Sequence, residues 1–396
     1  MKGIRGWRHG WAFAAVLLLF PMFMPAAGAP ASRPRPVRVI LMIGDGMGLS
    51  TVAHAHYHQF GADGFKPLAI ESLPVTGLAY THAKDRLVTD SAAAATALLS
   101  GCKTRNGMVG LDSQGKPVPT LLEEAKAAGL AAGVVTTAPL THATPAAAFA
   151  HVSDRKDYSS IFGWLLKNRP DVAIGWGGGP QSPYFPADYA QQAGAAGYRI
   201  CRSADELGRS QALPVLLVFE GDHHGVEGPP AETPGEPRLA DLTTRSLELL
   251  NRDPDGFFLM VEGGIIDWAN HAKNHPEAIA TTLDFDRSVE AVKTWVEAHG
   301  GWERTLLVVT SDHETGELAL RNPDGASSED AAHVDNPAGA LPPGAYAGFA
   351  YGSKDHSAIP VPVYSKGLGS AGLAGVFDNT RIHDVIRGVL PPPGKK

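Results

Sequence analysis

Residues 37–48 read VRVILMIGDGMG, an apolar run that stops abruptly at glycines on either side of one aspartate. The run at 37–43 is rich in β-branched residues and shows little polar alternation, which favours a strand buried on both faces of a parallel sheet. Four similar runs follow, each bounded by turn residues: AGVV at 132–135, VLLVF at 215–219, FFLMV at 257–261 and LLVV at 306–309. We therefore expect five buried strands.

Helical patterns lie between these runs. Thr120 and Glu123 form a capping box, which predicts that a helix begins there. The segment at 238–251 places its leucines on roughly one face, and Pro276 starts a longer helix that ends at the glycine pair 300–301. The alternation of strands and helices predicts an α/β fold with a mostly parallel central sheet flanked by helices on both faces.

The composition fits one large domain over residues 32–396, because 44% of the chain is hydrophobic. The stretch 321–355 is rich in Gly, Pro, Ser and Asp, which predicts a long surface excursion from that domain. The 34 basic and 41 acidic residues give a net charge of −7, so we expect no nucleic-acid recognition. The 16 histidines stand out, since histidine binds metals and moves protons near neutral pH.

Residues 1–31 have the pattern of a signal peptide. A basic start precedes an apolar stretch at 11–23 that is too short to span a membrane comfortably, and small residues follow, with the best cleavage point after Ala31. An uncleaved membrane anchor is the alternative. No later stretch could span a bilayer, so we expect an exported protein, periplasmic or extracellular, in which a Cys102–Cys201 disulfide is an open option.

Polar clusters follow the expected strands. They are the GDGMG turn around Asp45, TTAPLTHATP at 136–145, EGDHH at 220–224, EGGIIDWANH at 262–271 and TSDHE at 310–314. Ligands of an open parallel sheet bind beyond the carboxyl ends of its strands, so these clusters predict a site. A dinucleotide loop does not fit the first cluster, because Leu49 occupies the third glycine position.

The residue types in these clusters favour a metal. Asp267 and His271 are four residues apart, which places them on one face of a helix, and Asp312 and His313 are adjacent. A mixture of Asp and His without thiolates suits Zn²⁺ in an open, catalytic site. For any one such pair, a surface histidine is the competing interpretation; the whole set favours metal binding.

Ser91 is the candidate nucleophile. The segment VTDSAAAAT opens an alanine-rich helix with Ser91 in the first turn, where backbone N–H groups and the helix dipole favour an anion such as phosphate. The competing interpretation is a structural N-cap serine. No G-x-S-x-G elbow surrounds it, so a histidine-based hydrolase triad is not indicated.

Taken together, these stretches resemble the alkaline phosphatase family. The resemblance covers about residues 38–390 and rests on seven motifs in the family's order: IGDGMG, VTDSAAAATALLSGCKT, THATPAA, HVSDRK, VEGGIIDWANHA, TSDHETG and KDHSAIPVPVYSKG. It implies a phosphate monoester hydrolase that acts through a phosphoserine and uses two zinc ions and a third metal. That third metal is usually magnesium.

The resemblance also implies a role for each site residue. The first zinc would be held by Asp267, His271 and His356, the second by Asp45, Asp312 and His313 with Ser91, and the third metal by Asp45, Thr144 and Glu262. Arg155 would grip two phosphate oxygens in a bidentate clamp. Four carboxylates in one cleft would repel one another without cations, which agrees with this arrangement.

This chain departs from one common form of the family at two positions. His142 and Trp268 stand where some members have Asp and Lys. Because imidazole prefers zinc or cobalt to magnesium, we expect a third site that is less strictly magnesium, with His142 as a direct ligand. The rival is that His142 only contacts a ligand. A group of histidines at positions 54, 56 and 58 follows the first turn, and we expect these side chains to be exposed on a helix.

Other functions remain open at this point. A sulfatase or a phosphodiesterase on the same fold is one class, although Ser91 lacks the C/S-x-P-x-R context of sulfatases. A non-catalytic phosphate- or metal-binding export protein is another. The expected substrates are small-molecule phosphate monoesters of broad range, because only the phosphoryl group is gripped. The resemblance also allows a homodimer.

Overall fold

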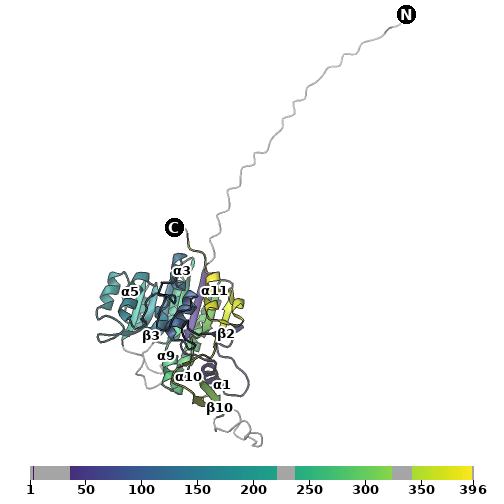
Figure 1. Ribbon diagram of the computed structural model, residues 1–396. Coiled ribbons are helices and arrows are strands. Elements are labelled where there is room, and N and C mark those ends of the chain that lie inside the picture. Colours follow the sequence, from purple (N-terminus) through teal and green to yellow (C-terminus); the bar gives the residue numbers. More distant parts are fainter. Residues whose placement is uncertain (1–2, 4–35, 221–236, 323–340, 395–396) are drawn as a thin grey trace, which may run out of the picture. The chain divides into compact units, whose positions relative to one another are not determined.

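A ten-stranded sheet lies at the centre of the described part of the chain, which in this computed structural model is Gly3 and residues 36–220, 237–322 and 341–394. In order across the sheet the strands are β14 (Gly375–Asp378), β2 (Val75–Tyr80), β13 (Val361–Gly367), β8 (Thr305–Thr310), β1 (Val37–Gly44), β7 (Gly256–Gly263), β3 (Ala131–Pro139), β4 (Val172–Gly178), β6 (Val215–Glu220) and β5 (Arg199–Cys201). Neighbours are parallel except that β13 runs antiparallel to β8 and β2. The predicted, mostly parallel sheet is confirmed (Figure 1).

Strand β1 is buried on both faces, as its sequence predicts. Val39 and Leu41 belong to the apolar cluster on one side of the sheet, whereas Ile40 and Met42 belong to the cluster on the other. All four side chains are fully buried. Burying such a side chain stabilises the fold by about 2 kcal/mol. β1 pairs with β7 on one side and β8 on the other.

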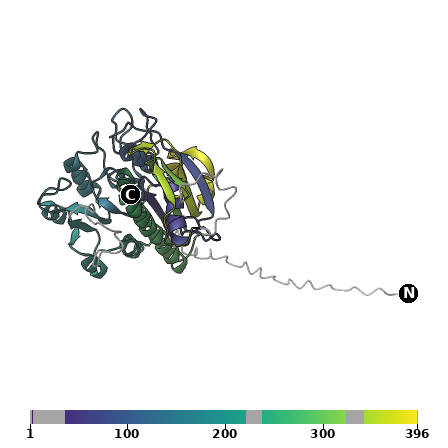
Figure 2. The same ribbon diagram turned by 90° about the horizontal axis from the view of Figure 1, so that it is seen from below.

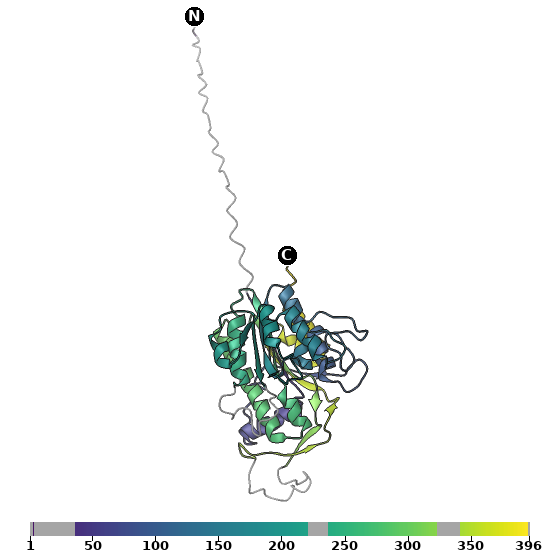
Figure 3. The ribbon, with the colours of Figure 1, turned by 90° about the vertical axis from the view of Figure 1, so that its left-hand side faces the viewer.

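Helices cover both faces. One apolar cluster includes side chains of α2 (Ser91–Ser100), α3 (Leu121–Ala127), α4 (Ala143–Ala146), α5 (Tyr158–Asn168), α6 (Tyr189–Ala195) and α11 (Thr380–Val389), with the short 3-10 helix at Ser370–Leu373. The other includes α1 (Leu49–Phe60), α7 (Ala204–Arg209), α8 (Leu239–Leu250), α9 (Ile265–His271) and α10 (His275–Ala298). Figure 2 shows the long α10 in green, and in Figure 3 strands run between helices.

The predicted helix starts agree with the structure. Both halves of the capping box are present at the start of α3, where the Thr120 hydroxyl accepts from the backbone N–H of Glu123 and the Glu123 carboxylate accepts from that of Thr120. Pro276 lies in the first turn of α10, and the Asn274 side chain caps that helix. Local capping interactions therefore account for the residues at which α3 and α10 begin.

Strand β4 was not among the five predicted strands. Its sequence, VAIGWGG, carries three glycines that weaken a strand signal, and it lies between the predicted β3 and β6. Close packing explains the glycines in part, because a Cβ on Gly175 would lie 2.8 Å from Thr136 and 2.9 Å from Leu140. The carboxyl-terminal end of β3 therefore packs tightly against β4.

The expected exposure of the α1 histidines is wrong for two of them. His54 and His56 are buried, and only His58 is half-buried. The His54 ring stacks on His275 at 6.1 Å between centroids, and His56 Nδ1 lies 2.6 Å from a carboxylate oxygen of Glu71. Burial, with the nearby His275 and His58, lowers the pKa of His54 to about 4. The helix is covered by segments distant in sequence.

The expected excursion at 321–355 contains a strand. β11 (Gly348–Tyr351) lies within it and runs antiparallel to β10 (Leu318–Arg321), so that residue 348 is held beside residue 321. Residues 323–340 lie outside the described residues, as does the expected signal peptide at 1–31 apart from Gly3. Within the described ranges, no helix has both the length and the apolar character needed to cross a membrane. Cys102 and Cys201 are separate thiols, without the disulfide that the sequence left open.

Candidate metal and phosphate site

The turn after β1 brings Asp45 against helix α9. Gly46 has a φ of +67°, a conformation that side chains rarely adopt. A Cβ at this position would lie 2.7 Å from both Asp267 Oδ1 and Thr315 Oγ1. The glycine is therefore needed both for the turn and for the close approach of these two side chains.

One predicted group of side chains converges beside Ser91. The Nε2 atom of His313 lies 3.1 Å from Ser91 Oγ, 3.4 Å from Asp45 Oδ1 and 3.2 Å from Asp312 Oδ2. Both of those carboxylate oxygens are buried and have no hydrogen-bond partner among the described residues. Buried carboxylate oxygens are costly unless paired, so this donor set of carboxylates and imidazole fits a Zn²⁺ ion.

A second predicted group lies next to it. His271 Nε2 and His356 Nε2 are 3.1 Å apart, and the two carboxylate oxygens of Asp267 lie 3.3 and 3.6 Å from them. The His313 and His356 rings stack at 3.5 Å between centroids, which joins the two groups. Two imidazole nitrogens facing each other beside a carboxylate need a shared cation, either a proton or a metal ion.

Backbone carbonyls orient the two histidines of this second group. His356 Nδ1 lies 2.9 Å from the carbonyl oxygen of Thr89, and His271 Nδ1 hydrogen-bonds the carbonyl of Lys354. Because a carbonyl only accepts, each Nδ1 carries the proton and donates it. Each Nε2 is thereby directed at the centre of the group, as in metal sites whose histidines are held by an outer partner.

The third predicted group contains Thr144 and Glu262. Thr144 Oγ1 donates to Asp45 Oδ2 at 3.2 Å, and the Thr136 hydroxyl donates to one oxygen of Glu262. The other oxygen of Glu262 is buried without a hydrogen-bond partner among the described residues. Glu262 also interacts with Thr144 and repels Asp45, so the three predicted oxygen ligands are close together. Hard oxygen ligands suit magnesium.

Crowding of carboxylates perturbs the whole cluster. Burial and the neighbouring carboxylates raise the pKa of Asp45 well above its ordinary value and raise that of Asp312 to about 7. Burial raises the pKa of Glu262 to about 8. Burial alone would also raise the pKa of Asp267, but the hydrogen bond to His271 together with the charges of His313, His356 and His271 outweighs burial and lowers that pKa. Such a site is electrostatically incomplete without cations.

Ser91 is the first residue of α2 and is not its N-cap. Asp90 takes the cap position, and its Oδ1 accepts from Ala93 N at 2.9 Å. The other oxygen of Asp90 lies 3.1 Å from Arg155 Nη1, so the cap residue holds the guanidinium beside the helix start. A helix N-terminus, a buried hydroxyl and an arginine together can bind a phosphate group.

His142 lies at the edge of this cluster. Its Nε2 is 3.4 Å from Arg155 Nη2, and its ring meets that of Trp268 edge-on at 5.6 Å between centroids. It directly precedes α4, which carries Thr144. The structure therefore places His142 beside Arg155, on the segment that leads into Thr144.

Sequence reasoning assigned no role to Asp90 or Thr315. Both lie inside quoted motifs, as the third residue of VTDSAAAA and the sixth of TSDHETG. The sequence signal for these two residues was their position within a motif. Their partners are distant in sequence, because Asp90 pairs with Arg155 and Thr315 hydrogen-bonds Asp267.

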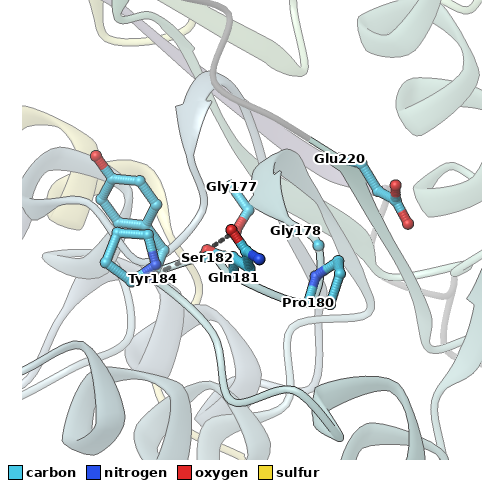
Figure 4. Close-up of a pocket in the computed structure, with 9 residues that line it drawn as sticks. Gly177, Gly178, Pro180, Gln181, Ser182, Tyr184 and Glu220 are labelled. Carbon is cyan, nitrogen blue, oxygen red and sulfur yellow. Dashed lines mark hydrogen bonds between the residues drawn. The ribbon is translucent and has the colours of Figure 1, made fainter.

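A pocket of about 380 Å³ lies at the carboxyl end of β4 (Figure 4). It is lined by residues 177–184 and Glu220, and the Tyr184 carbonyl accepts from the Thr141 hydroxyl at 3.0 Å. None of the predicted ligands, nor Ser91, lines it. The site is therefore defined by the converging side chains and not by this pocket.

Comparison with known proteins identifies the family of this chain. The alkaline phosphatase family model matches residues 37–174 and 186–337. Streptomycin-6-phosphate phosphatase of Streptomyces griseus is 34% identical over 97% of this chain and 97% of its own. Alkaline phosphatase H of Pseudomonas aeruginosa is 34% identical over 91% of this chain and 86% of its own.

Solved structures are similar over nearly the same range. A cold-active alkaline phosphatase from Shewanella superposes with a TM-score of 0.76 at 29% identity, covering 89% of this chain and all of that one. A histidine-to-glutamate mutant of the TAB5 alkaline phosphatase, with Mg bound in its M3 site, gives a TM-score of 0.73 at 27% identity over 90% and 98% of the two chains. The chain therefore belongs to the alkaline phosphatase family of metal-dependent phosphomonoester hydrolases.

Proposed function

We propose that this protein hydrolyses phosphate monoesters through a phosphoserine formed on Ser91, with two zinc ions and a third metal. One observation carries the proposal: Ser91 Oγ lies 3.1 Å from His313 Nε2, at the point where unpartnered oxygens of Asp45 and Asp312 also converge. Arg155 is held beside the same helix start by Asp90. Nucleophile, cation ligands and phosphate clamp thus meet at one place.

The ligand sets follow the three groups of side chains. Asp267, His271 and His356 would hold one zinc, Asp45, Asp312 and His313 the other, and Asp45, Thr144 and Glu262 the third metal. When bound, these ions supply Lewis-acid stabilisation of the attacking and leaving oxygens and lower the pKa of bound hydroxyl groups. The two unpartnered oxygens beside His313 support the second set most strongly.

The chain's own residues carry the reaction in two displacements. Arg155 donates two hydrogen bonds to the phosphate, while Ser91 Oγ forms a bond to phosphorus and the ester P–O bond breaks. Ser91 releases its hydroxyl proton to solvent as this bond forms, and the alcohol departs with the bonding electron pair and takes up one proton from solvent, so that the protons balance. Water then attacks the phosphoserine, the Ser91–phosphorus bond breaks, and inorganic phosphate and the serine hydroxyl are restored.

A substrate panel tests this proposal. We expect p-nitrophenyl phosphate to be hydrolysed at alkaline pH at least about 10³-fold faster than bis(p-nitrophenyl) phosphate or p-nitrophenyl sulfate, because the clamp and cations fit a dianionic phosphoryl group. Chelation abolishes the activity, and zinc with magnesium restores it. Faster turnover of the diester or sulfate, or phosphate binding without turnover, would contradict the proposal.

We further assign His142 as a direct ligand of the third metal, at a site that is less strictly magnesium and also takes zinc or cobalt. It lies two residues before Thr144 and 3.4 Å from Arg155. Two TAB5 mutants, in which a histidine is replaced by glutamate or aspartate, have Mg bound in the M3 site; carboxylate oxygens suit magnesium, whereas imidazole suits zinc or cobalt. Anomalous scattering at each site will show zinc or cobalt bound by His142. Magnesium with His142 unliganded would refute the assignment.

Residues 1–31 are proposed as the signal peptide, so that the mature enzyme is periplasmic or extracellular. The basic start, short apolar stretch and small residues before the expected cleavage point support this. We also propose a homodimer that acts on a broad range of small phosphate monoesters. N-terminal sequencing and light scattering of the exported protein would examine cleavage and assembly.

A further inference from the structure

Thr315 lies in a short strand pair that brings the two zinc groups together. β9 (Glu314–Thr315) runs antiparallel to β12 (His356–Ser357), with Thr315 directly opposite His356. Thr315 is fully buried. Its hydroxyl is therefore held in one place by backbone pairing and by packing.

The Thr315 hydroxyl contacts one member of each group. Thr315 Oγ1 lies 2.5 Å from Asp267 Oδ1 and 3.2 Å from His313 Nδ1. A hydroxyl has one proton, and an ionised carboxylate can only accept, so the proton goes to Asp267. Thr315 Oγ1 must then accept from His313, whose Nδ1 carries the ring proton.

This proton arrangement fixes what His313 presents to the site. With Nδ1 protonated, Nε2 carries the lone pair, and Nε2 is the atom that faces Ser91 and the unpartnered oxygens of Asp45 and Asp312. The other tautomer would direct an N–H at that point and leave no lone pair for a cation. One hydroxyl thus selects the metal-binding form of the ring.

The anchoring of His313 differs from that of the other two proposed histidine ligands. His271 and His356 donate to backbone carbonyls, which persist whatever side chain stands there. Among these three, only His313 has its Nδ1 anchored by a side chain in the described part of the chain. That side chain also bonds Asp267, a member of the neighbouring group.

We propose that Thr315 is a positioning residue that couples the two zinc sites. It holds the His313 ring in the tautomer that binds one cation, and through the same oxygen it orients the Asp267 carboxylate that binds the other. Removal of this hydroxyl therefore weakens both sites together. The inference rests on the proposed two-zinc function and adds a residue to it.

Zinc titration of the folded protein tests this coupling. In competition with a chromogenic chelator, we expect Thr315→Val to weaken both zinc-binding steps by roughly 10- to 100-fold, the usual effect of removing an outer hydrogen-bond partner of a metal ligand. Thr315→Ser keeps the hydroxyl and stays within about threefold of wild type. A matched control is Thr243→Val on α8, which removes a buried hydroxyl that has no hydrogen-bond partner among the described residues.

A second readout reports the histidine itself. In ¹⁵N-histidine NMR spectra of the zinc-loaded protein, His313 shows a protonated Nδ1 in wild type and Thr315→Ser. In Thr315→Val this Nδ1–H signal is lost or shifted. Thermal unfolding of the metal-free variants, expected to match wild type within a few degrees, shows that the fold is retained.

The possible outcomes distinguish failure of the Thr315 proposal from failure of the proposed two-zinc function on which it rests. A folded wild type that binds no zinc overturns both. If wild type binds two zinc ions and Thr315→Val binds them equally well, only the role of Thr315 is lost. The same conclusion follows if Ser and Val impair binding equally, or if only one site weakens.

Discussion

Replacing Ser91 by alanine will lower kcat for p-nitrophenyl phosphate by at least about 10³-fold, since loss of a covalent nucleophile can cost up to about 10⁶. The zinc content will stay at the wild-type level, because Asp45, Asp312 and His313 remain. Acid quenching of wild type with labelled substrate will trap a phosphoserine that the variant does not form. The measurement separates loss of the nucleophile from loss of the metal.

Ser100→Ala provides the matched control for this result. Ser100 ends the same helix, and its hydroxyl has no hydrogen-bond partner among the described residues. Its replacement should leave kcat unchanged within about twofold. A Ser91→Ala rate close to wild type, or an acid-stable label on the Ser91→Ala protein, would remove Ser91 from the mechanism.

The substitution Asp312→Asn is expected to have the second large effect, on both zinc content and catalysis. We expect it to cost one equivalent of zinc and about 10³-fold in kcat/KM, because a catalytic metal supplies several kcal/mol of transition-state stabilisation and each 1.4 kcal/mol is tenfold. Asn lacks the negative charge that the cation pairs with. Zinc per chain by elemental mass spectrometry and steady-state kinetics at saturating zinc measure both effects.

The same substitution will raise the melting temperature of the metal-free protein. Asp312 is fully buried, and burial together with the charge of Asp267 raises its pKa to about 7, so at pH 8 the ionised carboxylate opposes folding. Asp284→Asn on α10, a buried carboxylate that pairs with Arg287, is the control and keeps its zinc. An unchanged zinc content in Asp312→Asn would exclude Asp312 as a ligand.

The fold was predictable where burial depends on local sequence. Apolar runs such as residues 37–43 predict strands that are buried on both faces, and the Thr120 capping box predicts where a helix begins. The errors arose where distant segments decide. His54 is buried because His275 and the β11 residue Phe349 pack on it, and Phe349 is nearly 300 positions away in sequence. No local sequence pattern predicts this burial.

The motifs predicted a set of site residues, and the structure brings those side chains into three neighbouring groups. What the sequence could not supply is how they are held. Asp90 forms an ion pair with Arg155, and the Thr315 hydroxyl contacts both Asp267 and His313. These contacts depend on distances of about 3 Å between segments far apart in the chain. Motif position indicates that such residues matter, but only the assembled fold gives their partners.

The bond between His356 Nδ1 and the Thr89 carbonyl has a consequence for the timing of maturation. Its partners lie 267 positions apart, and a ribosome adding about 5–20 residues per second separates their synthesis by roughly 13 to 53 seconds. Throughout that interval the segment carrying Ser91 exists without the ring that completes the Asp267 group. With the proposed ligand set, the full complement of metals can therefore be bound only after His356 has been synthesised, and we expect fragments that end before His356 to be inactive.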